Sequence, residues 1–355
     1  MMRAVVFDEF EAVPEVRDVP DPVPPTHGAV VEVRATGLCR SDWHGWKGHD
    51  PDVRPPHVPG HEFAGTVAAV GSAVTRWRAG DRVTAPFVCA CGTCPTCLAG
   101  DHQVCERQTQ PGFTHWGSFA RYVVVHHADV NLVALPDGLG YPGAAALGCR
   151  FATAFRAVVA QGRLAAGEWL AVYGCGGVGL SAVMIGAACG ARVVAVDVSA
   201  AALESARRFG AEVCVDVATG DPAAAVRAAT GGGVHVSVDA LGSVNTCVWS
   251  VESLRRRGRH VQVGLLPAAA GRPALPLDRV IGYELELRGS HAMPAHAYPQ
   301  LLGLVASGVL RPDLLVAQTI GLDQAPAALT TMDRPGSGGI TLIDPSEPAR
   351  AHSAY

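Results

Sequence analysis

The segment that begins at Trp169 alternates apolar runs with helical runs, and this alternation limits the chain to few folds. Runs that predict strands are Trp169–Tyr173, Arg192–Val196, Val213–Val215, Val234–Val238, Arg259–Val263 and Leu285–Arg288. Runs that predict helices reach to about Cys189 and then cover Ala200–Phe209, Pro222–Ala229 and Val244–Leu254. Such alternation makes successive strands parallel and places helices on both faces. The sequence therefore predicts an α/β, doubly wound parallel sheet here.

The first third of the chain has a different pattern. Short runs that predict strands are separated by Pro and Gly; they are Ala29–Thr36, Phe63–Val70, Arg82–Ala85 and Phe119–Val125. Many short strands with frequent turns favour an irregular barrel. The stretch Pro294–Ile343 reads as helix, strand, helix, strand, and we expect it to return to this first domain. A chain of 355 residues fits two domains.

Charge and hydropathy exclude several classes of partner. The formal net charge is -4 and no basic block occurs, so we expect no nucleic acid partner. No apolar run approaches the roughly 20 residues that span a bilayer. The segment Met1–Phe10 carries acidic residues and does not fit a secretion signal. We therefore expect a cytoplasmic protein whose cysteines stay reduced.

A glycine-rich turn follows the first strand of the predicted sheet. Gly174, Gly176 and Gly179 form a G-x-G-x-x-G pattern between a strand and a helix. The first glycine permits a tight turn, the second lets a pyrophosphate approach, and the third allows close helix–strand packing. Asp197 ends the next strand, where an acid binds ribose hydroxyls and repels a 2′-phosphate, which favours NAD over NADP. The alternative is a turn without ligand and a solvated acid.

Four cysteines stand close together in the spacing C-x2-C-x2-C-x7-C. They are Cys91, Cys94, Cys97 and Cys105. Four thiolates on one short loop are typical of a closed, tetrahedral, structural zinc site. Two disulfides are the alternative, but the expected compartment argues against them.

A second set of candidate ligands is dispersed along the chain. Cys39, His61 and Cys149 supply two thiolates and one imidazole, which describes a catalytic zinc site with one open position. Zinc lowers the pKa of bound water to roughly 7 and would acidify an alcohol similarly, which favours loss of hydride to a nicotinamide. Spacing alone does not bring these three positions together, and each residue alone is more often a core or surface residue.

Five motifs in order resemble the zinc-dependent alcohol dehydrogenases of the medium-chain dehydrogenase/reductase family. They are Cys39-Arg40-Ser41-Asp42, Gly60–Gly65, the four cysteines, Gly148–Phe151 and the glycine turn. The resemblance implies a GroES-like β-barrel catalytic domain, residues 1–153 and 290–355, interrupted by a Rossmann NAD-binding domain, residues 154–289. It implies one catalytic and one structural zinc ion per chain, and an active site in the cleft between the domains.

The resemblance also assigns roles to individual residues. Ser41 would bond the substrate oxygen and begin proton removal, and His44 would pass the proton on. Asp42 would orient His61, and Glu62 would approach the metal when water leaves. The residues implied in cofactor binding are Arg40, Thr153, Gly174, Gly176, Gly177, Val178, Gly179, Asp197, Gly264 and Leu265.

The expected substrate is a small alcohol or carbonyl compound. A cysteine at position 149, where the polyol dehydrogenases of the family usually have glutamate, favours simple primary or secondary alcohols. Aromatic residues near the motifs hint at an apolar pocket; they are Trp43, Trp46, Phe87, Phe113 and Trp116. A polyol or amino-alcohol dehydrogenase and a non-catalytic scaffold remain alternatives. The resemblance further implies a homodimer or homotetramer, with the strand near Leu285 at the interface.

Overall fold

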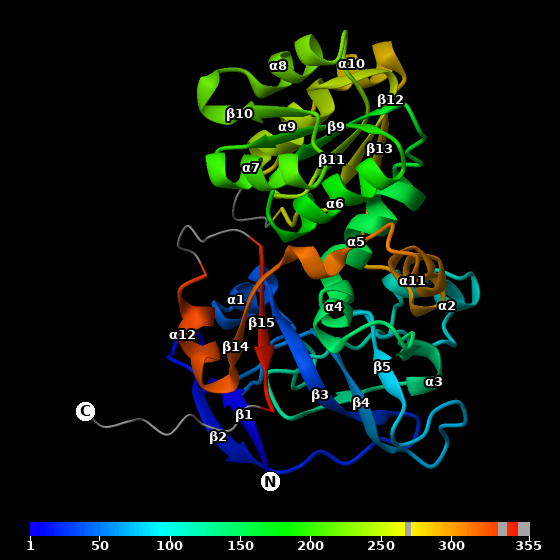
Figure 1. The fold of residues 1–355 in the computed structure, drawn as a ribbon, viewed down its shortest axis with the longest axis vertical. Coiled ribbons are helices and arrows are strands. Elements are labelled where there is room, and N and C mark those ends of the chain that lie inside the picture. Colours follow the sequence, from blue (N-terminus) through cyan, green and yellow to red (C-terminus); the bar gives the residue numbers. More distant parts are fainter. Residues whose placement is uncertain (267–270, 333–338, 347–355) are drawn as a thin grey trace. The chain divides into compact units, whose positions relative to one another are not determined.

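The computed structural model describes residues 1–266, 271–332 and 339–346 (Figure 1). The chain divides into two compact units. The first comprises Met1–Cys149 and nearly all of the described chain from Ala292 onward, and the second comprises Arg150–His291. The domain limits predicted from the sequence, after residues 153 and 289, lie a few residues from these divisions.

The second unit is built on a six-stranded parallel sheet with the order β10-β9-β8-β11-β12-β13. Its strands are β8 (Trp169–Tyr173), β9 (Arg192–Asp197), β10 (Val213–Asp216), β11 (Val234–Asp239), β12 (Leu254–Gln262) and β13 (Glu286–Gly289). Five α-helices connect them: α6 (Gly177–Ala188), α7 (Ala200–Arg208), α8 (Pro222–Ala229), α9 (Val244–Glu252) and α10 (Leu277–Tyr283). The predicted doubly wound sheet is confirmed.

Local sequence explains these elements. Every residue of β8 is buried, as expected for a central parallel strand that is covered on both faces. Three helices begin at side chains that accept a hydrogen bond from a backbone N–H in the first turn: Ser199, Asp221 and Ser243. Helix α10, whose residues are all at least partly exposed, was not predicted from the sequence.

The first unit contains a seven-stranded sheet. Its order is β14-β15-β3-β4-β5-β7, and β6 also pairs with β3. The strands are β3 (Ala29–Leu38), β4 (Glu62–Val70), β5 (Arg82–Thr84), β6 (Tyr122–Val125), β7 (Val133–Ala134), β14 (Val316–Gly321) and β15 (Ile340–Asp344). The C-terminal strand β15 pairs antiparallel with β3, so the end of the chain does return to this unit (Figure 1).

The remaining elements of the first unit are short. A separate hairpin joins β1 (Met2–Val6) to β2 (Glu15–Val19), and the sequence analysis did not predict it. The α-helices are α1 (Arg40–Trp46), α2 (Pro95–Leu98), α3 (Ala128–Asn131), α4 (Tyr141–Ala145), α11 (Tyr298–Ala306) and α12 (Ala325–Thr330), and α5 (Ala152–Phe155) opens the second unit. Two π-helical turns, Leu147–Phe151 and Arg156–Gln161, flank α5.

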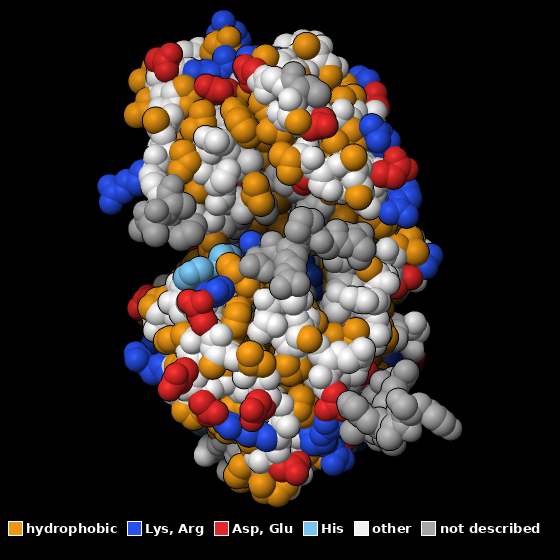
Figure 2. Space-filling model, turned by 90° about the vertical axis from the view of Figure 1, so that its left-hand side faces the viewer, with side chains coloured by type: hydrophobic (Ala, Val, Ile, Leu, Met, Phe, Trp, Pro, Cys, Tyr) orange, Lys and Arg blue, Asp and Glu red, His pale blue; other side chains and the backbone are white. Residues whose placement is uncertain are grey.

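The described helices include none that is both long enough and apolar enough to cross a bilayer. The face of the molecule in Figure 2 carries acidic and basic side chains interspersed among apolar ones. This mixture fits the small net charge of -4.

Candidate active site

The four-cysteine segment folds into a compact lobe in the first unit. Cys91, Cys94, Cys97 and Cys105 are all buried, and their sulfur atoms lie within 4.8 Å of one another. The closest pairs, Cys94 with Cys105 and Cys91 with Cys97, have Sγ–Sγ distances of 3.8 and 4.0 Å. A disulfide bond is about 2.05 Å long, and all four cysteines are free thiols, so the disulfide alternative does not describe this lobe.

The backbone of the lobe is arranged to stabilise thiolates. The N–H groups of Thr93 and Cys94 donate to the sulfur of Cys91, at 3.5 and 3.4 Å. Burial opposes ionisation of Cys91, yet these hydrogen bonds lower the pKa of its thiol to about 5. The N–H of Cys97 likewise donates to Cys94 and lowers the pKa of that thiol. Burial instead raises the pKa of the Cys97 and Cys105 thiols. The four converging, buried sulfurs fit a tetrahedral zinc ion.

A second cluster gathers residues that lie far apart in the sequence. Single ligand atoms of Cys39, His61, Glu62 and Cys149 all lie within 4.8 Å of one another. The β3–β4 pairing sets Gly37 opposite Glu62, so the end of β3 brings Cys39 beside the start of β4. Cys149 lies in the first π-helical turn, where Gly148 passes so close that an added Cβ would stand 3.0 Å from Glu62 Cα.

Asp42 connects the parts of this cluster. Its carboxylate is buried and accepts three hydrogen bonds: from the N–H of Cys39 (2.9 Å), the N–H of Gly60 (3.0 Å) and Nδ1 of His61 (2.9 Å). The bond to Nδ1 leaves Nε2 of His61 to face the cluster, and Nε2 is buried without a hydrogen-bond partner in the described structure. A carboxylate that orients an imidazole in this way is typical of metal sites.

Electrostatics around His61 agree with a metal site. Burial lowers the pKa of His61, but the Asp42 carboxylate and the sulfur of Cys39 outweigh it and raise that pKa well above the ordinary value. A cation is therefore favoured at this point. The unpartnered Nε2, two thiols and a carboxyl group fit a zinc ion, which accepts nitrogen, sulfur and oxygen ligands.

The predicted proton-transfer residues lie on α1. The Ser41 hydroxyl lies 3.8 Å from the sulfur of Cys39, beside the cluster. His44, one turn on, is half-buried, and its Nδ1 lies 2.9 Å from Nδ1 of His49. His49 was not predicted from the sequence. Its position five residues after His44 was the one feature that could have indicated this contact. The exposed His49 therefore extends the side-chain path from His44 toward solvent.

The backbone of the glycine turn requires glycine at two of its positions. Gly174 has φ 89°, a left-handed conformation that disfavours other residues. An added Cβ on Gly179 would lie 1.8 Å from the carbonyl oxygen of Gly174, so only glycine allows this helix–strand contact. At Gly176, which caps α6, an added Cβ would meet nothing within 4 Å. This open space and the free N–H groups at the start of α6 suit a pyrophosphate.

Two other predicted cofactor residues belong to the second unit. Asp197 ends β9 and accepts hydrogen bonds from the N–H groups of Cys175 (2.6 Å) and Ser199 (2.8 Å). Thr153 is buried, yet its Oγ1 has no hydrogen-bond partner among the described residues, which suits a residue that hydrogen-bonds a cofactor.

Five further residues complete the predicted set. Gly177 and Val178 begin α6, and an added Cβ on Gly177 would lie 2.5 Å from Cδ of Arg150. Gly264 donates its N–H to the carbonyl oxygen of Asp239, and Leu265 is 66% exposed. Arg40 belongs to the first unit, where it donates to the carbonyl oxygen of Met332.

The predicted aromatic residues divide into two groups. The rings of Phe113 and Phe87 lie 5.1 and 6.0 Å from the ring of His61, beside the metal cluster. Trp43 and Trp46 belong to one hydrophobic core cluster, and Nε1 of Trp46 donates to the carbonyl oxygen of Ala12. Trp116 donates to the carbonyl oxygen of Pro56. Phe113 and Phe87 are therefore the better candidates for a substrate wall.

Comparisons with known proteins agree with this geometry. Residues 25–137 match the alcohol dehydrogenase GroES-like domain, and residues 177–307 match the zinc-binding dehydrogenase family. An alcohol dehydrogenase from Geobacillus stearothermophilus is 37% identical over 269 residues, which cover 75% of this chain and 78% of the relative. The chain belongs to the zinc-dependent alcohol dehydrogenases of the medium-chain dehydrogenase/reductase family. 

Two further proteins are also similar to this chain. The alcohol dehydrogenase TADH from Thermus sp. ATN1 superposes with a TM-score of 0.89 at 33% identity, covering 97% of this chain and 99% of that chain. D-arabitol-phosphate dehydrogenase from Enterococcus avium is 32% identical over 299 residues, 83% of this chain and 84% of the relative.

One buried residue at the metal cluster was not predicted. Tyr298, at the start of α11, is fully buried, and its hydroxyl donates to the carbonyl oxygen of Gly148 at 3.3 Å. This bond holds the π-helical turn that carries Cys149. The contact joins positions 150 residues apart, and nothing in the local sequence signals it.

Replacing one lobe cysteine tests the structural zinc site. Cys97→Ser removes one of four converging sulfurs, and we expect the purified protein to lose about one of its two zinc ions per chain. We also expect a lower unfolding temperature, because structural zinc contributes to folding free energy. Metal analysis by mass spectrometry and calorimetry measure both effects. Cys189→Ser, outside both clusters, is the control; equal zinc contents in the two variants would contradict the assignment.

Replacing Asp42 tests how the catalytic cluster is oriented. Asp42→Asn keeps the size of the side chain but removes the charge that holds Nδ1 of His61. We expect zinc affinity at this cluster to fall by about 10- to 100-fold, the usual effect of losing such a partner. Competition with a colorimetric chelator measures the affinity. Asp52→Asn, an exposed residue of the same unit, should leave it unchanged; a similar affinity for both variants would refute this role.

Proposed function

We propose that this protein interconverts primary or secondary alcohols with aldehydes or ketones, using zinc and NAD. The observation that carries the proposal is the cluster of Cys39, His61, Glu62 and Cys149 in one chain with a complete glycine turn. An alcohol that loses a proton and a hydride becomes a carbonyl compound, and NAD takes the hydride. The zinc cluster would act on the alcohol oxygen and its proton, and the glycine turn would hold the NAD that accepts the hydride.

The metal ligands and the proton acceptor have distinct tasks. Cys39, His61 and Cys149 would hold the zinc ion, which when bound acts as a Lewis acid toward the substrate oxygen. Glu62 lies within the same cluster and would approach the metal as an oxygen ligand when water leaves. Ser41, beside Cys39, would accept the proton of the alcohol.

His44 would carry that proton onward. Burial lowers the pKa of His44, as do the neighbouring His49 and Arg40, while Cys39 raises it. The net direction is downward from about 6.5, so the imidazole is neutral at pH 7 and can accept a proton. Its contact with the exposed His49 offers an exit to solvent.

The surroundings of the metal cluster favour apolar alcohols. Phe87 and Phe113 flank His61, and Cys149 stands where a polyol dehydrogenase of this family usually has glutamate. The similarity to a D-arabitol-phosphate dehydrogenase keeps a polyol substrate as the second candidate. An amino alcohol is the other alternative substrate, and threonine represents it in the substrate panel.

The protein is further proposed to act as a homodimer or homotetramer in the cytoplasm. Strand β13 forms one edge of the six-stranded sheet, and an unpaired edge is suited to pairing with a second copy. The described cysteines form no disulfide bond with one another, as expected in a reducing compartment.

A substrate panel tests the proposed reaction. The zinc-loaded protein would be given hexanol, benzyl alcohol, 2-propanol, sorbitol and threonine, each with NAD and with NADP, and absorbance of the reduced nicotinamide would be followed. We expect NAD reduction with the apolar alcohols, with kcat/KM at least about tenfold above that for sorbitol or threonine, or roughly 1.4 kcal/mol. Turnover confined to sorbitol or threonine would contradict the proposed substrate class.

Replacing Asp197 tests the preference for NAD. Asp197→Asn keeps an oxygen to accept from Cys175 but removes the charge that repels a 2′-phosphate. We expect the ratio of kcat/KM for NADP to that for NAD to rise by about tenfold or more. Asp216→Asn, at the matching position of neighbouring β10, is the control. An unchanged ratio in Asp197→Asn would contradict the role of this carboxylate.

A further inference from the structure

A pocket rich in arginine lies at the amino ends of the strands of the second unit. It has a volume of about 510 Å³, and its lining includes Arg163, Arg255, Arg256, Arg257, Arg259 and His235. We call this set the arginine pocket. His235 and Arg255 lie at the starts of β11 and β12, whereas the glycine turn follows the other end of β8 in the same parallel sheet. The pocket is therefore distinct from the candidate cofactor site.

The start of β12 explains why three arginines project together. In the β11–β12 ladder Val234 pairs with Leu254, but Val236 pairs with Arg259. The segment 255–258 therefore bulges opposite His235 alone, and its three arginines are exposed. Arg257 has φ 62°, a left-handed conformation that is costly for a non-glycine residue.

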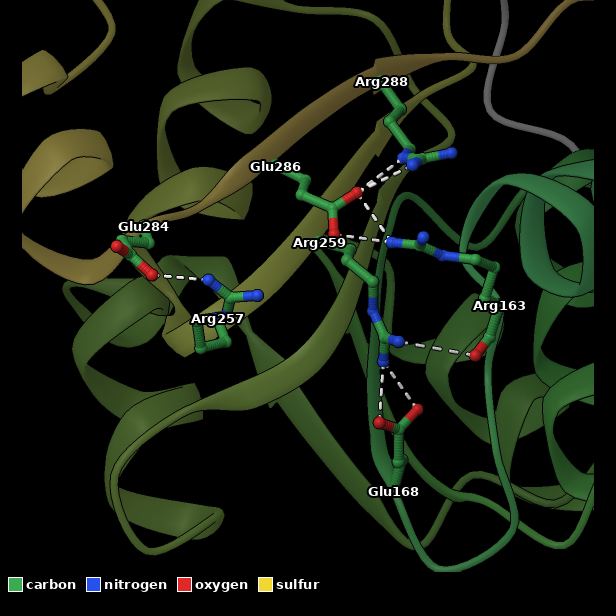
Figure 3. A network of polar contacts seen from close by, with 7 residues as sticks. All are labelled: Arg163, Glu168, Arg257, Arg259, Glu284, Glu286 and Arg288. Carbon is green, nitrogen blue, oxygen red and sulfur yellow. Dashed lines mark hydrogen bonds and ion pairs between the residues drawn. The ribbon is translucent and has the colours of Figure 1, made fainter.

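The ion pairs around the pocket leave an excess of positive charge. Arg259 binds Glu168 through two contacts of 2.7 and 2.6 Å, and Arg163 binds Glu286 through two contacts of 2.5 and 2.6 Å. Figure 3 draws these ion pairs. Arg288 also binds Glu286, and Arg257 binds Glu284. The pocket and its ion pairs thus contain six arginines and three glutamates. The arginines are 163, 255, 256, 257, 259 and 288, and the glutamates are 168, 284 and 286. The surplus of three positive charges stands out in a chain of net charge -4.

The contact between His235 and Arg255 identifies where an anion would bind. The backbone N–H of Trp169 donates to Nδ1 of His235 at 2.9 Å, so Nδ1 is an acceptor. A neutral imidazole with an accepting Nδ1 carries its proton on Nε2. Nε2 nevertheless lies 3.1 Å from the guanidinium NH1 of Arg255, which is also a donor.

Two donors that face each other cannot form a hydrogen bond with one another. An acceptor placed beside both of them can accept a hydrogen bond from each. Burial lowers the pKa of His235, and the neighbouring Arg255 lowers it further. The ring is therefore neutral at pH 7 and keeps one proton, on Nε2. A phosphate oxygen supplies a charged acceptor, and guanidinium groups bind phosphate by paired, charge-assisted hydrogen bonds.

We propose that the arginine pocket binds a small polyphosphate-bearing anion, with one oxygen shared by Arg255 and His235. The volume of about 510 Å³ is in the range of small-molecule sites, which favours such a ligand over a macromolecule. Inorganic polyphosphate and a nucleoside polyphosphate share this chemistry. Binding here is independent of the proposed alcohol chemistry.

Calorimetric titration tests the site directly. The zinc-loaded, full-length protein is saturated with NAD, so that the glycine turn is occupied, and titrated with inorganic tripolyphosphate. We expect saturable binding of one ligand per chain that weakens as salt rises. Arg255→Gln should weaken it at least about tenfold, and Arg256→Gln should weaken it also. Arg78→Gln, an exposed arginine of the first unit, makes the same charge change and should bind within about twofold of wild type.

Two further readings complete the test. ATP that binds more tightly than tripolyphosphate would identify a nucleoside polyphosphate as the ligand, and equal or weaker binding would identify an inorganic polyanion. The proposal is overturned if wild type shows no saturable binding, or if Arg255→Gln binds like Arg78→Gln. It is also overturned if tripolyphosphate does not bind while Arg255→Gln changes the oligomeric state in sedimentation, since the face would then be a contact between copies.

Discussion

The candidate active site depends on the three hydrogen bonds that the buried Asp42 carboxylate accepts. One bond fixes the start of α1 at Cys39, one fixes the turn before β4 at Gly60, and one fixes the ring of His61. A single side chain thus sets the position of two candidate metal ligands, Cys39 and His61, and leaves Nε2 of His61 facing the cluster. Burying a carboxylate costs free energy because the group loses its hydration. The three hydrogen bonds to Asp42 offset that cost.

Close backbone approach is the second constraint, and glycine provides it in both units. Gly148 lies against Glu62, which lets the π-helical turn of Cys149 reach the cluster of candidate metal ligands, and Gly179 lies against Gly174 in the glycine turn.

The two ends of the parallel sheet in the second unit carry different side chains. Its carboxyl ends carry the glycine turn and Asp197, and its amino ends carry the arginine pocket.

Local patterns were enough to predict the sheet of the second unit and the four-cysteine lobe, because hydrophobic runs and ligand spacing are local properties. The meeting of Cys39, His61 and Cys149 was implied only by resemblance, since it depends on β3–β4 pairing and on the Tyr298 contact with Gly148. The β1–β2 hairpin and the bulge in β12 were also missed. A bulge is a mismatch between two strands, and neither strand alone reveals it.

The most direct test of the account is anomalous diffraction at the zinc edge from crystals of the zinc-loaded protein. Two peaks per chain are predicted, one among the four lobe cysteines and one among Cys39, His61 and Cys149. A chain with a peak in the lobe but none at Cys39, His61 and Cys149, in protein that is active with NAD, would contradict the central claim.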